Sequence, residues 1–207
     1  MREWQSKAPR SGHPMRRFLM SGLGDRESPG GRSSASPDDA EAADLMVAFA
    51  RAASAGWRGY TMMDPFMQAA LDEALQGLRE GGIPIGSALV AGDRVLGRGH
   101  NRRQQAGSVV LHAEMDALER AGRQPAAVYR LCTLYTTLSP CAMCSGAILL
   151  YGIPRVVVGE NRTFRGEEDL LRSRGVIVEV LQDSACERLL ADFIRAHPAL
   201  WNEDIGV

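Results

Sequence analysis

The sequence predicts an α/β protein, a three-layer α/β/α sandwich built on a five-stranded mixed sheet. From residue 110 onward, strand-like segments alternate with helical ones, which implies crossover connections and parallel strands. Before that point, two strand-like segments flank a Gly-Asp turn and predict an antiparallel hairpin. Apolar residues make up 45% of the 207 residues, enough to cover a sheet with helices on both faces.

The first half of the predicted domain is a helix followed by the hairpin. Asp64-Pro65 fits an N-cap and a first helical position, and apolar residues at helical spacing continue to Gly81-Gly82. Residues 85–91 and 95–99 are expected to be the two hairpin strands.

The second half is expected to alternate helices and strands. Residues 131–138, rich in Thr, Leu and Tyr, are typical of a buried strand, and Ser139-Pro140 is expected to start the next helix. The other boundaries follow from apolar period and from Gly or Pro stops. The remaining predicted helices are 111–121, 139–151, 167–174 and 184–196, and the remaining strands are 155–159 and 176–181.

Residues 1–60 differ in composition from the rest of the chain. Residues 1 to about 40 are rich in Arg, Gly, Ser and Pro and lack hydrophobic periodicity, so they cannot bury enough apolar surface to offset the entropy of ordering. We expect a disordered tail over 1–60, which an over-extended gene start would also explain, and one folded domain over 61–207.

The charge of the chain bears on its binding partners and chemistry, and its apolar runs bear on its cellular location. The tail carries nine Arg or Lys against seven Asp or Glu, whereas residues 61–207 carry fifteen against eighteen, a net charge of −3 that disfavours nucleic acid as a partner. The single lysine, Lys7, lies in the tail, which excludes lysine Schiff-base chemistry in the domain. No apolar run is long enough to span a membrane, and no export signal is evident, so a cytoplasmic protein is expected.

Two short motifs carry the chemistry. His112-Ala113-Glu114 and Pro140-Cys141-Ala142-Met143-Cys144 each open a predicted helix. Free N–H groups at a helix start stabilise thiolates, and cysteines three apart lie on one helical face. Two thiolates and one imidazole suit zinc, and three protein ligands leave a fourth position for water, as catalytic sites do.

Glu114 is the candidate catalytic residue. Zinc lowers the pKa of a bound water, and a carboxylate two residues beyond His112 can face that water without binding the metal. It can take the water's proton and pass it to a ring nitrogen and then to a leaving amine. H-x-E with P-C-x-x-C is the signature of zinc-dependent nucleobase deaminases.

Two alternatives to a catalytic zinc site stay open at this point. Cys141 and Cys144 could be a redox pair, although that leaves the His-x-Glu motif unexplained. A structural zinc would need a fourth Cys or His ligand. Cys132 and Cys186 are interpreted as core residues instead, and His100 as a residue that orients a loop.

From Asp64 to Gly206 the chain resembles the fungal-type free-base cytosine deaminases, within the zinc-dependent cytidine and deoxycytidylate deaminase superfamily. The resemblance extends beyond the zinc motif. The matching stretches are Glu80–Gly86, Val95–Asn101, Leu111–Glu114, Thr133–Cys144, Gly146–Ile148, Tyr151–Arg155, Val158–Asn161 and Trp201–Gly206.

The resemblance implies roles for further residues and a homodimer. Asn101 and Asp204 would bind the base edge around O2 and N1–H, with the main-chain N–H of Ala113 as a further donor to O2. Ser139 would offer its carbonyl to the leaving amine, and the Cys141 N–H would bind the developing oxygen. Phe164 and Trp201 would form an apolar lid. A carboxylate against N1–H excludes a nucleoside, in which N1 carries the sugar.

Four functions are compatible with these residues. The first is hydrolysis of free cytosine to uracil and ammonia, which the Asn101, Trp201 and Asp204 set favours. The second is deamination of another free base, such as guanine or a modified pyrimidine or triazine. The third, a tRNA adenosine deaminase, would need a basic surface. A non-catalytic zinc module is the fourth reading, and iron in place of zinc stays open.

Overall fold

The computed structural model describes residues 63–207 of the chain. Within this range five strands form one sheet in the order β2-β1-β3-β4-β5. β1 is antiparallel to β2 and β3, whereas β3, β4 and β5 run parallel. The strands are β1 (Gly86–Ala91), β2 (Arg94–His100), β3 (Cys132–Leu138), β4 (Arg155–Glu160) and β5 (Ile177–Val180). The predicted five-stranded mixed sheet is confirmed.

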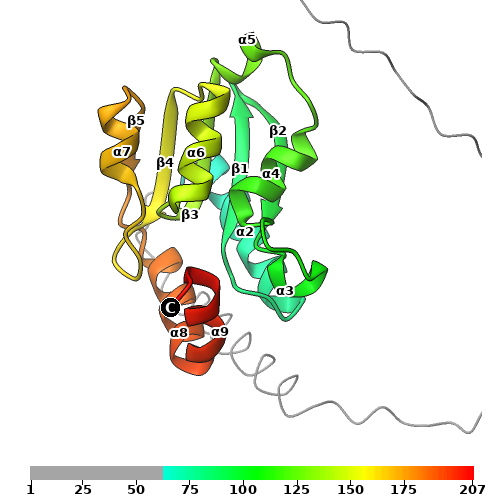
Figure 1. The fold of residues 1–207 in the computed structure, drawn as a ribbon, viewed down its shortest axis with the longest axis vertical. Helices are drawn as coiled ribbons and strands as arrows, with labels where there is room; N and C mark the ends of the chain where they lie inside the picture. The colour runs from blue at the N-terminus through cyan, green and yellow to red at the C-terminus, as the bar shows by residue number, and fades with distance from the viewer. Residues whose placement is uncertain (1–62) are drawn as a thin grey trace, which may run out of the picture. The chain divides into compact units, whose positions relative to one another are not determined.

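Helices cover both faces of this sheet, as predicted. α4, α6 and α7 lie in front of it in Figure 1, and α2 lies behind it. Two hydrophobic clusters fill the layers, one on the side of α2 and α8 and the other on the side of α4, α6 and α7. The helices are α2 (Pro65–Arg79), α3 (Arg103–Ala106), α4 (Ala113–Ala121), α5 (Ala126–Tyr129), α6 (Ala142–Tyr151), α7 (Glu168–Ser173), α8 (Ser184–Ala196) and α9 (Pro198–Ile205).

Close packing of α2 and α4 on the sheet depends on glycines of the strands. A Cβ at Gly86 of β1 would collide with the backbone of α2 at Ala70. A Cβ at Gly97 or Gly99 of β2 would collide with the backbone of α4. These glycines let both helices approach the strands closely, which fixes the start of α4 and therefore the position of His112.

The helix starts are where sequence and structure agree best. Asp64 caps α2 by accepting hydrogen bonds from the backbone N–H groups of Phe66 and Met67, at 2.8 and 3.3 Å. α4 begins two residues and α6 three residues later than predicted, so His112 and Cys141 are their N-cap residues. An N-cap is only half inside the helix, which leaves these side chains free to face away from it.

Three helices were not predicted. α3 and α5 are single turns of four residues. α9 begins at Pro198, two residues after the end of the predicted helix 184–196, which stops before this proline. Proline can both stop one helix and start the next, for one physical reason. It has no backbone N–H, which the interior of a helix needs for a hydrogen bond, whereas the N–H of the first helical position would have no partner within the helix. α9 matters because it carries Trp201 and Asp204.

The tail predicted over 1–60 lies outside the described residues. Over 63–207, none of the helices combines the length and the apolar character that crossing a membrane would require.

Candidate active site

A cavity of about 340 Å³ opens where β3 and β4 end. We call it the active-site cavity. Ligands of parallel α/β sheets are commonly bound at the carboxyl ends of the strands. The residues predicted for the site line this cavity, except for Cys144: they are Asn101, His112, Ala113, Glu114, Ser139, Cys141, Phe164, Trp201 and Asp204.

Three candidate metal ligands converge at the floor of the cavity. His112 lies at the start of α4, and Cys141 and Cys144 lie at the start of α6. Their ligand atoms all lie within 4.8 Å of one another, and His112 Nδ1 is 3.5 Å from Cys141 Sγ. Cys144 is fully buried behind the cavity wall. Two helix N-termini therefore place an imidazole and two thiols around one point.

This donor set fits zinc. Sulfur and imidazole ligands from three residues match catalytic zinc sites, and among the described residues no fourth His or Cys joins the group. Cys132 and Cys186 are buried in the core away from it, as predicted. Hydrogen bonds from Cys144 and His112 lower the pKa of Cys141 to about 4, so a thiolate is available there.

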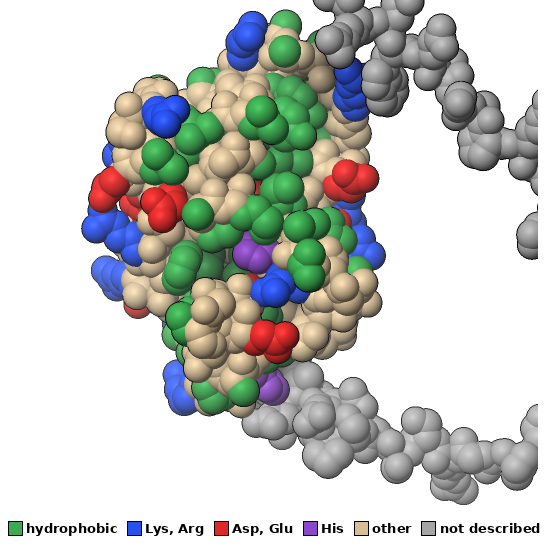
Figure 2. Space-filling view, viewed as in Figure 1, with side chains coloured by type: hydrophobic (Ala, Val, Ile, Leu, Met, Phe, Trp, Pro, Cys, Tyr) green, Lys and Arg blue, Asp and Glu red, His purple; other side chains and the backbone are tan. Residues whose placement is uncertain are grey.

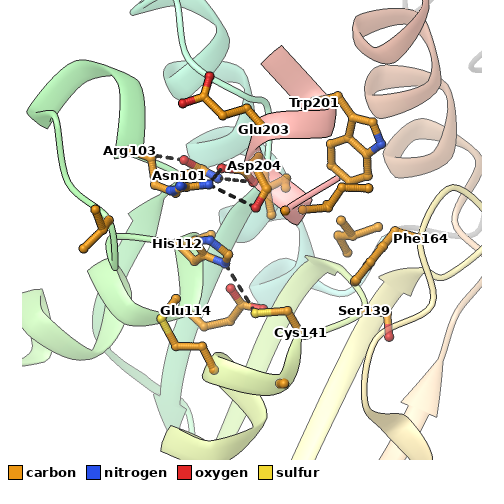
Figure 3. Close-up of a pocket in the computed structure, with 18 residues that line it drawn as sticks. Asn101, Arg103, His112, Glu114, Ser139, Cys141, Phe164, Trp201, Glu203 and Asp204 are labelled. Atoms are coloured by element: carbon orange, nitrogen blue, oxygen red, sulfur yellow. Dashed lines mark hydrogen bonds and ion pairs between the residues drawn. The ribbon is translucent and has the colours of Figure 1, made fainter. Parts of the chain in front are cut away.

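Glu114 lies beside these ligands on the first turn of α4 (Figure 3). Only 4% of its surface is exposed. Its Oε2 accepts a hydrogen bond from the Cys144 thiol at 3.3 Å, and its Oε1 accepts one from Thr136 at 3.4 Å. Burial raises the pKa of Glu114, which suits a carboxylate that has to accept and release a proton near neutral pH.

A polar group forms one side of the cavity. Asn101 is buried at the end of β2, and its Nδ2 donates to Asp204 Oδ2 at 3.0 Å. Arg103 Nη1 donates to Asp204 Oδ1 at 2.8 Å. Figure 3 shows these three side chains together, above His112. The resemblance pointed to Asn101 and Asp204, but the sequence reasoning missed Arg103.

Aromatic residues form the opposite side. Phe164, in the loop after β4, meets Trp201 of α9 edge-to-face with ring centroids 6.1 Å apart (Figure 3). Trp201 is buried and Phe164 is half-buried, so the pair can cover a flat ligand while the loop remains accessible.

Ser139 is fixed by contacts that the sequence did not reveal. Its Oγ donates to the buried Glu168 at 2.9 Å and accepts from the Gly166 N–H at 3.0 Å. Asn161 also donates to Glu168, at 2.8 Å. No spacing rule links a residue after β3 to a carboxylate on α7, so Glu168 could not have been found from the sequence.

The chain is similar to known deaminases. Residues 61–160 match the family model described as the cytidine and deoxycytidylate deaminase zinc-binding region. A cytosine deaminase of Candida albicans is 57% identical over 141 residues, which cover 68% of this chain and 94% of that protein. A tRNA-specific adenosine deaminase of Streptococcus pyogenes is 38% identical, over 63% of this chain and 88% of its own length.

Solved structures agree on the fold. One from a study of tRNA:A34 deaminases superposes with a TM-score of 0.52 at 29% identity, covering 61% of this chain and 99% of that one. A guanine deaminase from Nitrosomonas europaea, at 22% identity and a TM-score of 0.53, covers 82% of this chain and 98% of that one, and supports the fold alone.

The α/β/α fold and the His-Cys-Cys site therefore define a zinc-dependent hydrolytic deaminase. Within that class, the chain belongs to the cytidine and deoxycytidylate deaminase family and is similar to its cytosine deaminases.

Proposed function

We propose that the protein hydrolyses free cytosine to uracil and ammonia. The observation that carries this proposal is one cavity lined by two of the candidate zinc ligands, His112 and Cys141, by a buried carboxylate and by the polar Asn101–Asp204 edge, with Cys144 directly behind its wall. The 57% identity to a cytosine deaminase, over nearly all of that protein, supports the choice of base.

His112, Cys141 and Cys144 would hold the zinc, which supplies an electrophilic centre and an activated water when bound. Glu114 would accept the proton of the attacking water and deliver it to the ring nitrogen next to the reacting carbon. It would then take the proton of the hydroxyl group added to that carbon and transfer it to the departing amine. Its burial keeps bulk water from competing for that proton.

The other cavity residues would orient the base. The Asn101 amide and the Asp204 carboxylate would bind O2 and N1–H, and the Ala113 N–H, at the start of α4, is free of intrahelical bonds and would add a donor to O2. The Ser139 carbonyl would accept from the leaving amine, and the Cys141 N–H would bind the developing oxygen. Phe164 and Trp201 would close over the ring.

The test is ammonia release by the purified, zinc-loaded protein on cytosine, cytidine, guanine, adenine and buffer. We expect release from cytosine and none from cytidine, because a sugar on N1 removes the N–H that Asp204 would bind. Release from guanine or another base would keep the zinc chemistry and change the substrate. Equal rates on cytosine and cytidine would contradict the N1–H contact.

Deamination of adenosine in tRNA is the second candidate, because relatives at 38% identity carry that name. Residues 61–207 have a net charge of −3, which does not favour binding to a phosphate backbone. Inosine formation in tRNA, with no turnover of free bases, would establish this candidate instead.

We also propose a homodimer that works in pyrimidine salvage in the cytoplasm. Large apolar side chains are exposed around α4 and α6, and Figure 2 shows apolar atoms gathered over this face. They include Val109, Val110, Leu131, Leu150 and Tyr151. Such patches on a folded domain are typical of protein interfaces. Light scattering should give about twice the chain mass of 22.5 kDa, and a monomer would contradict the dimer.

The proposed location in the cytoplasm is supported by the thiolate ligands, because they have to stay reduced to bind the metal and the cytoplasm is a reducing compartment.

A further inference from the structure

Arg103 fastens the last helix to the site. It lies on α3, yet its Nη1 donates both to Asp204 Oδ1, at 2.8 Å, and to the Asp204 backbone carbonyl, at 3.0 Å. Asp204 Oδ2 is meanwhile bonded to Asn101. The Arg103 and Asp204 side chains are only 23% and 5% exposed, so this ion pair is largely shielded from solvent. Both carboxylate oxygens are thus held in one orientation.

The same ion pair separates two cavities. A second cavity, of about 220 Å³, lies next to the active-site cavity. Four residues line both of them, namely Arg103, Val109, Glu203 and Asp204. The Arg103–Asp204 pair is therefore part of the wall between the two cavities. This wall lies on the same side of the active-site cavity as Asn101.

We propose that Arg103 is a positioning and specificity-determining residue, which holds Asp204 as an N1–H acceptor and closes the wall against substituents on N1. This inference rests on the proposed function. A carboxylate accepts hydrogen bonds only, so a base with a methyl group or sugar on N1 loses that bond. The substituent would also point at the wall, and with the wall fixed the second cavity cannot receive it.

The contact geometry indicates which substitution should preserve the effect. Both bonds from Arg103 to Asp204 come from the single nitrogen Nη1, and the buried Nε has no hydrogen-bond partner among the described residues. One ammonium group could therefore replace the guanidinium at Asp204. Alanine, in contrast, removes the bonds and connects the two cavities.

The experiment compares cytosine with 1-methylcytosine in the zinc-loaded full chain, for wild type, Arg103→Ala and Arg103→Lys. In Arg103→Ala we expect KM for cytosine to rise about tenfold, as for a lost charged hydrogen bond, with a smaller change in kcat. The ratio of kcat/KM for cytosine to that for 1-methylcytosine should fall at least about tenfold. Arg103→Lys should restore most of the ratio.

Arg155→Ala is the matched control, because it removes an arginine–glutamate pair of similar length, 2.6 Å to Glu179, outside the cavity wall. It should leave both substrates unchanged. An equal loss of kcat/KM on both substrates in Arg103→Ala would mean that Arg103 has only a structural role, and would overturn the inference. An unchanged KM for cytosine together with an unchanged ratio of the two kcat/KM values would overturn it as well. Wild type is assayed first: no turnover of cytosine would overturn the proposed function itself, whereas turnover with an unaltered ratio in the variant overturns only this inference.

Discussion

Glu114 illustrates how one residue is prepared for proton transfer. It is buried, and its carboxylate accepts hydrogen bonds from Thr136 and Cys144. Glu114→Gln keeps the shape and removes the titratable oxygen. We expect turnover to fall at least about a hundredfold, the scale of general acid–base catalysis, while bound zinc measured by atomic absorption stays at the wild-type level.

Unchanged turnover in Glu114→Gln would contradict the proton-transfer role. A loss of zinc together with activity would instead show that the carboxylate supports the metal site.

His100 shows a structural role that differs from the predicted one. It was expected to orient a loop, but it is 2% exposed and lies between the carboxylates of Glu73, on α2, and Glu80, the C-cap of that helix. Its Nδ1 is 3.0 Å from Glu73 and its Nε2 is 2.9 Å from Glu80, so each ring nitrogen faces a carboxylate oxygen, and the protonated ring can donate to both. The hydrogen bond to Glu73, with that to Glu80, raises the pKa of His100 against the opposing effect of burial.

This arrangement makes stability depend on pH. A raised pKa in the folded state stabilises the protein fully below the unfolded pKa, near 6.5, and the contribution is lost as pH rises through the folded value. His100→Gln should therefore cost about 2 kcal/mol of unfolding free energy at pH 6, and less at pH 9. Urea titrations at both pH values measure it, and a cost that grows with pH would contradict the charged ring.

At the scale of elements, the loop from Asn161 to Gly166 depends on α7. Glu168, 2% exposed, accepts from Ser139, Asn161 and Arg172, the last at 3.0 Å. The loop carries Phe164, and a Cβ at Gly166 would collide with the carbonyl of Pro140, so the loop lies directly against the residue before Cys141. One buried carboxylate thus links the loop that carries Phe164 to the segment that holds the candidate metal ligands.

Glu168→Gln should loosen this loop, because an amide cannot accept all three bonds and turns a donor toward Arg172. We expect a loss of about 1–2 kcal/mol in unfolding free energy and a higher KM for the substrate base. Asp169→Asn is the control on the same helix, at a side chain that is 80% exposed, and should change stability by less than about 0.5 kcal/mol. Equal effects of the two substitutions would argue against the anchoring role.

α9 is the element that the sequence could not supply. Its pattern has no strong apolar face, and only Trp201 is buried on it. Its position depends on Trp201 packing against Phe164 and on Asp204 meeting Asn101 and Arg103. These partners are distant in the sequence, so local propensity could neither start the helix nor place it.

At the scale of the whole molecule, the core and the metal site are separate sources of stability. Two hydrophobic clusters fill both faces of the sheet, whereas the candidate zinc ligands lie beyond the ends of its central strands. Chelation should abolish activity and lower the melting temperature, since a ligand that binds only the folded state stabilises it, but the chain should remain folded at 25 °C. Calorimetry and circular dichroism with and without zinc test this, and unfolding on chelation would identify a structural metal.

The sequence by itself determined the layer order, the mixed sheet and the candidate metal ligands, because these depend on hydrophobic period, on helix starts and on motif spacing over a few residues. His112, Cys141 and Cys144 could be paired because each lies at the beginning of a helix that follows a strand or loop. The tertiary structure alone decided that Arg103 holds Asp204, that Glu168 holds Ser139 and that α9 closes the cavity. The contacts of Arg103 and Asp204 join residues 101 positions apart, and such contacts are set by packing of the whole fold rather than by any local pattern.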